Sequence, residues 1–137
     1  MDALFARLSP FAPYALAALR IMAGLLFLAH GTQKLFGFPP SNGPAPELLS
    51  LRGIGGVIEI ATGALIALGL FTRPAAFIAS GTMAVAYFYA HAPQNFFPVN
   101  NGGDAAILYC FIFLYFVFAG PGPLSLDAKL RGNRTLS

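Results

Sequence analysis

The sequence predicts an all-α membrane protein: a transmembrane four-helix bundle with both termini on the cytoplasmic side. Three observations support this fold class. Of the 137 residues, 57% are hydrophobic and only 9% are charged, whereas a soluble domain usually carries about 25% charged residues. The apolar residues form long segments separated by breaks rich in proline and glycine. Lysine and arginine are distributed unequally between the ends of these segments, and this bias sets membrane orientation.

The apolar segments are each close to the ~20 residues that a helix needs to cross the hydrocarbon core. They show no alternation of polar and apolar residues, which favours helices over barrel strands. The first segment is too long for the core of a signal peptide and contains Arg20, so we expect it to be retained as a span. We predict one domain, residues 1–137, with spans at residues 14–36, 51–71, 74–92 and 104–119.

The basic residues predict the orientation. If the termini share one side, the opposite side carries the two long loops, 38–50 and 93–103, and receives only Lys34 and Arg52. The termini are therefore expected to be cytoplasmic, and Arg20 is expected to extend its charge to that same interface. The basic residues on the cytoplasmic side would be Arg7, Arg73, Lys129, Arg131 and Arg134.

Ionisable side chains inside a span need a reason, because each costs ~3 kcal/mol on insertion scales. Arg20, Phe27 and Lys34 are spaced by seven residues and so lie on one stripe of the first helix. His30 adjoins that stripe, one turn before Lys34. The stripe predicts a polar wall of an internal pocket. The alternative is that Arg20 and Lys34 extend to opposite interfaces while His30 forms a core hydrogen bond.

Glu59 is the most informative residue, because a lone carboxylate in a span must be protonated or paired. It lies about two turns from the outer end of the second span, the depth at which His30 is also expected, so the two side chains could meet. Gly55, Gly56 and Gly63 flank Glu59 and would permit close helix approach. The alternative is a structural pair that joins two helices without serving a ligand.

The third and fourth segments bring polar residues to the same outer level. His91 ends the third span, with Tyr87 one turn below it on the same face. Asp104 opens the fourth span, although Asn101 can cap that helix and Asp104 then suits its positive end. We predict one ligand pocket in the outer half of the bundle, with His30 and Glu59 as a candidate proton relay. Its lining residues would be His30, Lys34, Glu59, Tyr87, His91 and Asp104.

Several stretches resemble the DoxX family of small bacterial membrane proteins: "LRIMAGLLFLAHGTQKLFGF", "GVIEIATGALIALGLFTRPAA", "FYAHAPQNFFPVNNGGDAAILY" and "GPGPLSLD". The resemblance covers about residues 14 to 130 and implies a four-span fold in the bacterial inner membrane. The family commonly has Glu where Asp104 stands, and the carboxylate is kept. Some relatives are subunits of a thiosulfate:quinone oxidoreductase, others are parts of oxidoreductase complexes, and distant ones are cargo receptors or assembly chaperones. The resemblance therefore implies function only in outline.

The function that this combination favours is a redox-associated, quinone-linked subunit. A pocket open to lipid suits a quinone, a His or Lys can hydrogen-bond its carbonyl, and a carboxylate can relay protons. The chain has one cysteine, Cys110, and no nucleotide-binding fingerprint, so electrons would come from a redox partner protein or an exogenous donor.

Other functions remain open at this stage. A non-enzymatic adaptor, chaperone or lipid-like ligand binder would also explain an apolar pocket. Two histidines on different helices, His30 and His91, suggest haem b as a less favoured cofactor. No tight ligand spacing supports a metal site, and the few scattered cations do not predict nucleic-acid binding. Enzyme activity of the isolated chain is left undecided, and a homo-oligomer stays open.

Overall fold

The computed structural model describes residues 1–134, which contain helices and no strand, so the all-α prediction is confirmed. A single turn of 3₁₀-helix (η1, Ser9–Phe11) follows the first helix, and a π-helical turn (η2, Tyr87–His91) extends the fourth. The α-helices are α1 (Asp2–Leu8), α2 (Ala12–Phe36), α3 (Leu51–Leu68), α4 (Thr72–Ala86), α5 (Pro98–Asn101), α6 (Asp104–Ala119) and α7 (Leu126–Arg134).

The main helices agree with the predicted segments to within a few residues. Helix α3 ends at Leu68 because Gly69 adopts a left-handed conformation with φ 68°, and its amide donates to carbonyl oxygens of the last turn. Helix α4 follows at once, with Pro74 in its first turn, where a missing N–H has no cost. The sequence did not predict α1, α5 or α7, which are short and carry no long apolar run.

Two helical stretches are long and apolar enough to cross a membrane: residues Asp2–Phe36 and helix α3. Helix α6 is a shorter apolar helix of 16 residues. Helix α4 has 15 residues and reaches a comparable length to α3 only together with the 5-residue turn η2. Residues Asp2–Phe36 and helix α3 are thus each long enough for a span, whereas α4 and α6 are shorter.

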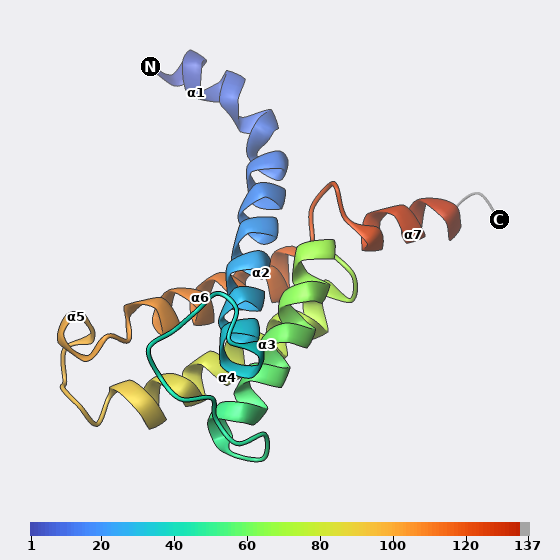
Figure 1. The fold of residues 1–137 in the computed structure, drawn as a ribbon. Helices are drawn as coiled ribbons and strands as arrows, with labels where there is room; N and C mark the ends of the chain where they lie inside the picture. Colours follow the sequence, from blue (N-terminus) through green and yellow to red (C-terminus); the bar gives the residue numbers. More distant parts are fainter. Residues whose placement is uncertain (135–137) are drawn as a thin grey trace.

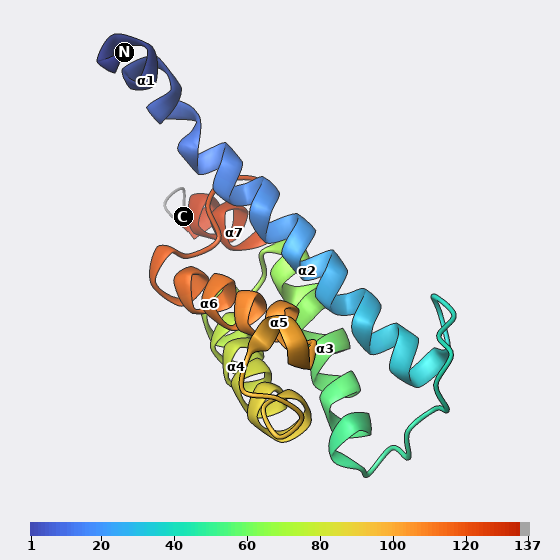
Figure 2. The same cartoon turned by 90° about the vertical axis from the view of Figure 1, so that its left-hand side faces the viewer.

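The helices pack as two pairs. Helix α2 lies along α3, α4 lies along α6, and the contact between α3 and α4 joins the pairs. Figures 1 and 2 show that the pairs cross and diverge toward the ends that carry the 38–50 loop and α5. This divergence distinguishes the molecule from a bundle of four nearly parallel helices.

Glycines allow α2 and α3 to come into backbone contact. A Cβ on Gly24 would lie 2.6 Å from the amide nitrogen of Ala67, and one on Gly63 would lie 2.7 Å from that of Leu28. The expected close approach around Glu59 therefore holds for Gly63, and Gly56 also faces α2. Gly55 differs, because a Cβ there would meet nothing within 4 Å.

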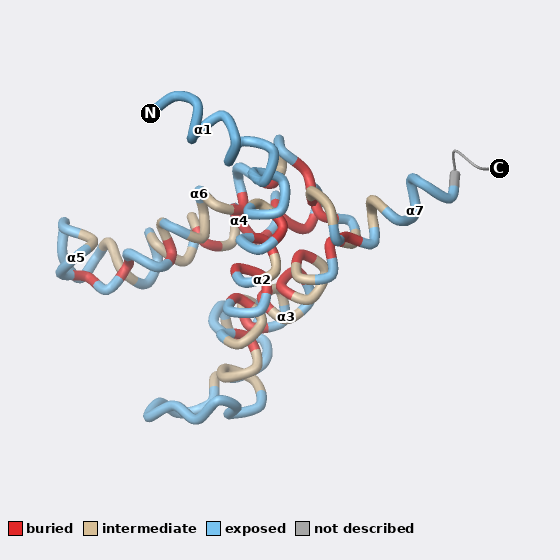
Figure 3. Tube along the Cα trace, turned by 90° about the horizontal axis from the view of Figure 1, so that it is seen from above, coloured by how far each residue is buried: buried red, intermediate tan, exposed pale blue. Residues whose placement is uncertain are grey.

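The hydrophobic core lies where the two pairs meet, as the buried positions in Figure 3 show. Phe27 from α2 packs against Phe113 from α6, with ring centroids 4.9 Å apart. Small residues of α4, Ala76 and Ala79, are fully buried in the same core cluster and let the helices approach. Phe27 belongs to the predicted polar stripe of α2, so that stripe does face the interior.

Arg20 shows the largest departure from the sequence-based expectation. Its side chain is fully buried, and Nη2 donates to the carbonyl oxygen of Leu124 at 2.8 Å. The prediction that Arg20 extends its charge to the interface is wrong, because the loop after α6 covers it. Asp127 fixes that same region by accepting from the amides of Phe71 and Thr72 at 2.9 and 3.0 Å.

Candidate functional site

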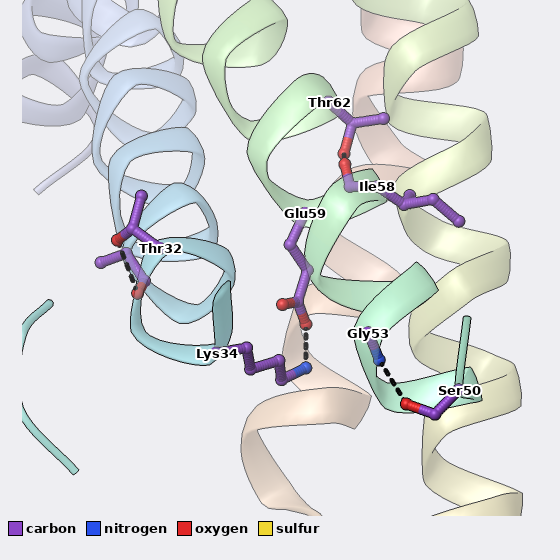
Figure 4. Close-up of polar contacts among 8 residues, drawn as sticks. Thr32, Lys34, Ser50, Gly53, Ile58, Glu59 and Thr62 are labelled. Atoms are coloured by element: carbon purple, nitrogen blue, oxygen red, sulfur yellow. Dashed lines mark hydrogen bonds and ion pairs between the residues drawn. The ribbon is translucent and has the colours of Figure 1, made fainter. Parts of the chain in front are cut away.

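An ion pair between α2 and α3 forms the centre of the candidate site. The Lys34 Nζ donates to Oε1 of Glu59 at 2.7 Å, and Figure 4 shows the lysine reaching across from the last turn of α2. The Glu59 side chain is only 3% exposed, whereas that of Lys34 is 24% exposed. The partner of Glu59 is therefore Lys34 rather than His30.

Local sequence explains why these two groups meet. Helix α2 ends at Gly37, whose left-handed conformation closes the helix just after Lys34 and leaves a cation in its negative last turn. Helix α3 begins after Ser50, which caps it by accepting from the amide of Gly53 at 3.1 Å. Glu59 lies about two turns into α3, and antiparallel packing brings it level with the end of α2.

The second oxygen of the Glu59 carboxylate is unsatisfied. Oε2 is buried and has no hydrogen-bond partner in the described part of the chain. A buried acceptor that lacks a donor costs about 1–3 kcal/mol, so a donor from outside the chain would be favoured here. Of the two carboxylate oxygens of Glu59, only Oε1 is therefore paired.

An apolar groove between α3 and α4 adjoins the pair, and we call it the α3–α4 groove. Its volume is about 530 Å³, and both Lys34 and Glu59 line it. Several of its apolar residues are exposed on the outer surface of the helices, where they would face lipid. Its apolar wall includes Ile54, Ile58, Phe77, Ile78 and Val85.

His30 lies in an aromatic contact on α2 and α6. It is exposed, and its ring meets that of Tyr109 edge-on at a centroid distance of 5.9 Å. Tyr109 also stacks on Phe113 at 5.6 Å and lies within electrostatic range of the Glu59 carboxylate. Tyr109 is thus near both His30 and Glu59, and His30 does not line the α3–α4 groove.

The remaining predicted site residues form a separate group at the α5 end. The His91 Nδ1 and the carbonyl oxygen of Asn101 are 3.0 Å apart, and the Asn101 side-chain amide donates to the Tyr87 hydroxyl at 3.3 Å. The His91 ring stacks on Tyr87 at a centroid distance of 6.4 Å. Asp104 is exposed and begins α6, where its charge suits the positive helix end.

The structure thus places the six predicted residues in separate environments. Lys34 and Glu59 form an ion pair, whereas Tyr87 and His91 pack around Asn101. Within residues 1–134, no hydrogen bond or ion pair joins these two groups, and the helix pairs diverge toward the ends that carry them. The structure therefore does not join the six residues in one hydrogen-bonded cluster, and a shared ligand pocket, with a role for each group in binding, stays a prediction.

Sequence reasoning did not assign Arg52, Tyr109 or Asn101 to a site. Arg52 lines the α3–α4 groove, and a signal for it exists, since it precedes Glu59 by seven residues and so shares its face of α3. Tyr109 lies in a helix that is apolar all round, where the sequence does not show which face is buried. In the described residues, no three His, Cys, Asp or Glu side chains are arranged to hold a metal ion.

Comparison with known proteins identifies the family. The DoxX family model matches residues 15–92. An uncharacterized protein of Haemophilus influenzae is 48% identical, covering 89% of this chain and 95% of that protein. An uncharacterized membrane protein of Mycobacterium tuberculosis is 32% identical (90% of this chain, 85% of that one), and the inner membrane protein YphA of Escherichia coli is 31% identical (85% and 91%).

No solved structure matches the chain. The names of the relatives agree with the apolar helices, and the expected location in the bacterial inner membrane is confirmed. The resemblance in the sequence is confirmed as well, since the family model covers more than half of the chain. The chain is a membrane protein that belongs to the DoxX family.

Proposed function

We propose that this DoxX-family protein binds a lipid-soluble quinone in the α3–α4 groove and serves as a redox-associated membrane subunit. The groove offers an apolar wall for an isoprenoid tail and a hydrogen-bonding end for a polar head group. The observation that carries the proposal is Oε2 of Glu59, a buried acceptor without a donor beside an apolar groove.

The two side chains of the ion pair offer such a head group one hydrogen-bond donor and one acceptor. A quinone takes up two electrons and two protons to become a quinol. The Lys34 ammonium retains N–H donors beyond the one used by Glu59 and can donate to a ring carbonyl oxygen. The unpartnered Glu59 oxygen can accept from a quinol hydroxyl and then take its proton.

The proton relay predicted from the sequence, His30 and Glu59, would include Tyr109. His30 contacts the Tyr109 ring, and the Tyr109 hydroxyl lies within electrostatic range of Glu59. A proton that leaves Glu59 toward His30 would pass by that phenol. The electrons would be supplied by a redox partner protein or by an exogenous donor.

We also propose that all four segments cross the membrane and that both termini are cytoplasmic. Figures 1 and 2 support this, because α1 and α7 lie toward the same end of α2, opposite the 38–50 loop. The end with the termini carries most of the basic residues, as the positive-inside rule requires of a cytoplasmic side. The α3–α4 groove would then open laterally into the bilayer.

The proposal is tested by extracting gently purified protein and identifying co-purified quinone by mass spectrometry, followed by titration with quinol. We expect bound quinone in the wild type and at least about tenfold weaker binding in Glu59→Gln and Lys34→Met, the loss of one charged hydrogen bond. Asp2→Asn is the matched control, because it removes one carboxylate that is exposed at the far end of α1.

Two outcomes would change the assignment. Wild-type-like binding in both Glu59→Gln and His30→Ala would remove these residues from the site. A different apolar molecule, or a stable protein partner with no redox change on any substrate, would support the adaptor or lipid-binding function in place of the quinone-linked one.

A further inference from the structure

A small polar pocket lies between the end of α2, the 38–50 loop and the start of α3. Its volume is about 140 Å³. Lys34 and Arg52 line this pocket and also line the α3–α4 groove. The two spaces therefore meet at these two cations, one space polar and the other apolar.

The charges at this junction do not balance. Lys34 is neutralised by Glu59, with Nζ and Oε1 2.7 Å apart. Arg52 has neither an ion pair nor a hydrogen bond within residues 1–134, and its side chain is exposed. Among the residues that line the polar pocket, Arg52 is therefore a cation without an ion-pair partner.

The loop positions further polar groups around that guanidinium. The Gln33 amide donates to the carbonyl oxygen of Pro40 at 3.3 Å and so fastens the loop over the pocket. A Cβ on Gly43 would lie 3.9 Å from Nη2 of Arg52, so the guanidinium lies beside the loop at Gly43. Ser41 also lines the pocket, and a serine hydroxyl can donate a hydrogen bond.

We propose that this polar pocket binds the phosphodiester of a membrane phospholipid, with Arg52 as its main ligand. A guanidinium presents paired N–H donors that fit two phosphate oxygens, which is the geometry that arginine recognises best. A phosphodiester carries one negative charge and so matches the single uncompensated cation, whereas free phosphate carries more at neutral pH. The junction with the groove gives the acyl chains an apolar path beside the bound head group.

This phosphodiester site goes beyond the proposed quinone function and does not depend on it. It rests on Arg52 and the 38–50 loop, whereas the quinone assignment rests on the unsatisfied oxygen of Glu59. Because Arg52 also lines the α3–α4 groove, both ligands are measured in Arg52→Gln and in Glu59→Gln, and we expect Arg52→Gln to lose phosphatidylglycerol while it retains quinone.

The experiment is a titration of delipidated, detergent-purified full-length protein with phosphatidylglycerol, followed by native mass spectrometry. We expect a bound lipid in the wild type and at least about tenfold weaker binding in Arg52→Gln. Arg52→Lys keeps the charge but not the paired donors, so intermediate binding is expected. Arg7→Gln is the matched control, because it removes an exposed cation from α1, away from the pocket.

Two competitors show whether binding of phosphatidylglycerol depends on its acyl chains or on its phosphate group. Diacylglycerol, which has the chains without the phosphate, should not displace the lipid, and inorganic phosphate should not displace it at moderate excess. Equal binding in Arg52→Gln and the wild type, or displacement by diacylglycerol, would overturn the proposal. Binding of inorganic phosphate with no binding of phosphatidylglycerol would overturn the lipid as the source of the phosphate group.

Discussion

The Nζ of Lys34 and the Oε1 of Glu59 are 2.7 Å apart and join the last turn of α2 to the middle of α3. Removing one member of a buried ion pair leaves an uncompensated charge. We expect Lys34→Met to lower the free energy of unfolding by about 3 kcal/mol. The double variant Lys34→Met/Glu59→Gln should recover much of this loss, because it buries no lone charge.

Unfolding of the purified variants by increasing denaturing detergent gives the free energies for this double-mutant cycle. Strictly additive effects of the two substitutions would show that the pair is not coupled, contrary to its geometry.

The backbone contact between α2 and α3 predicts a difference between two glycines of the same helix. In Gly63→Ala the new Cβ would lie 2.7 Å from the Leu28 amide nitrogen, so the helices must separate, at a cost of ~1–3 kcal/mol. Gly55→Ala is the control, because its Cβ meets nothing within 4 Å and alanine favours the helix. Thermal unfolding should show a lower midpoint for Gly63→Ala only, and equal midpoints would contradict the close packing.

The α3–α4 groove can be filled without disturbing the core. Gly81 lines the groove, and a Cβ there meets nothing within 4 Å, so Gly81→Leu adds a side chain at an open position of the groove. We expect the amount of co-purified quinone to fall at least tenfold while the unfolding midpoint stays the same. Ala61→Leu, on an exposed position of α3 that does not line the groove, should retain wild-type quinone. Unchanged quinone in Gly81→Leu would place the ligand elsewhere.

Asp127 predicts how stability depends on pH at the end with the termini. Burial alone raises its pKa, but amide hydrogen bonds from Thr72 and Phe71 and the charge of Arg131 outweigh burial, so the pKa lies below its ordinary value. A carboxyl with a depressed folded-state pKa contributes stability above its unfolded pKa, about 3.9. That contribution is lost as the pH falls through the folded-state pKa.

The unfolding midpoint of the wild type should therefore decrease below about pH 4. In Asp127→Asn the midpoint should already be lower at pH 7 and should change less on acidification. Asp2→Asn, which changes an exposed carboxyl at the N-terminus, is the control and should follow the wild type. A parallel pH profile for Asp127→Asn would show that the amide hydrogen bonds do not stabilise the junction of α4 and α7.

The helices themselves could be predicted from the sequence because their signals are local. Helix α6 begins and ends where the apolar run does, and the breaks at Gly37 and Gly69 follow from the left-handed conformation that glycine adopts easily. Burial of the stripe that contains Arg20 and Phe27 also follows from helical spacing. These features depend only on residues a few positions apart.

Partners across helices could not be predicted in the same way. Depth along a span gave His30 as the candidate partner of Glu59, and only the rotation of α2 against α3 decides for Lys34. The heptad-spaced glycines set that rotation, because the backbones touch only where side chains are absent.

Sequence alone therefore determined that this is an apolar, helical membrane protein, since hydropathy and helix-ending residues act locally. The tertiary structure decided that its polar groups form separate clusters and not one hydrogen-bonded cluster. The physical reason is the divergence of the pair α2–α3 from the pair α4–α6, with the apolar groove between α3 and α4. That angle arises from packing between segments far apart in the chain, and no local pattern encodes it.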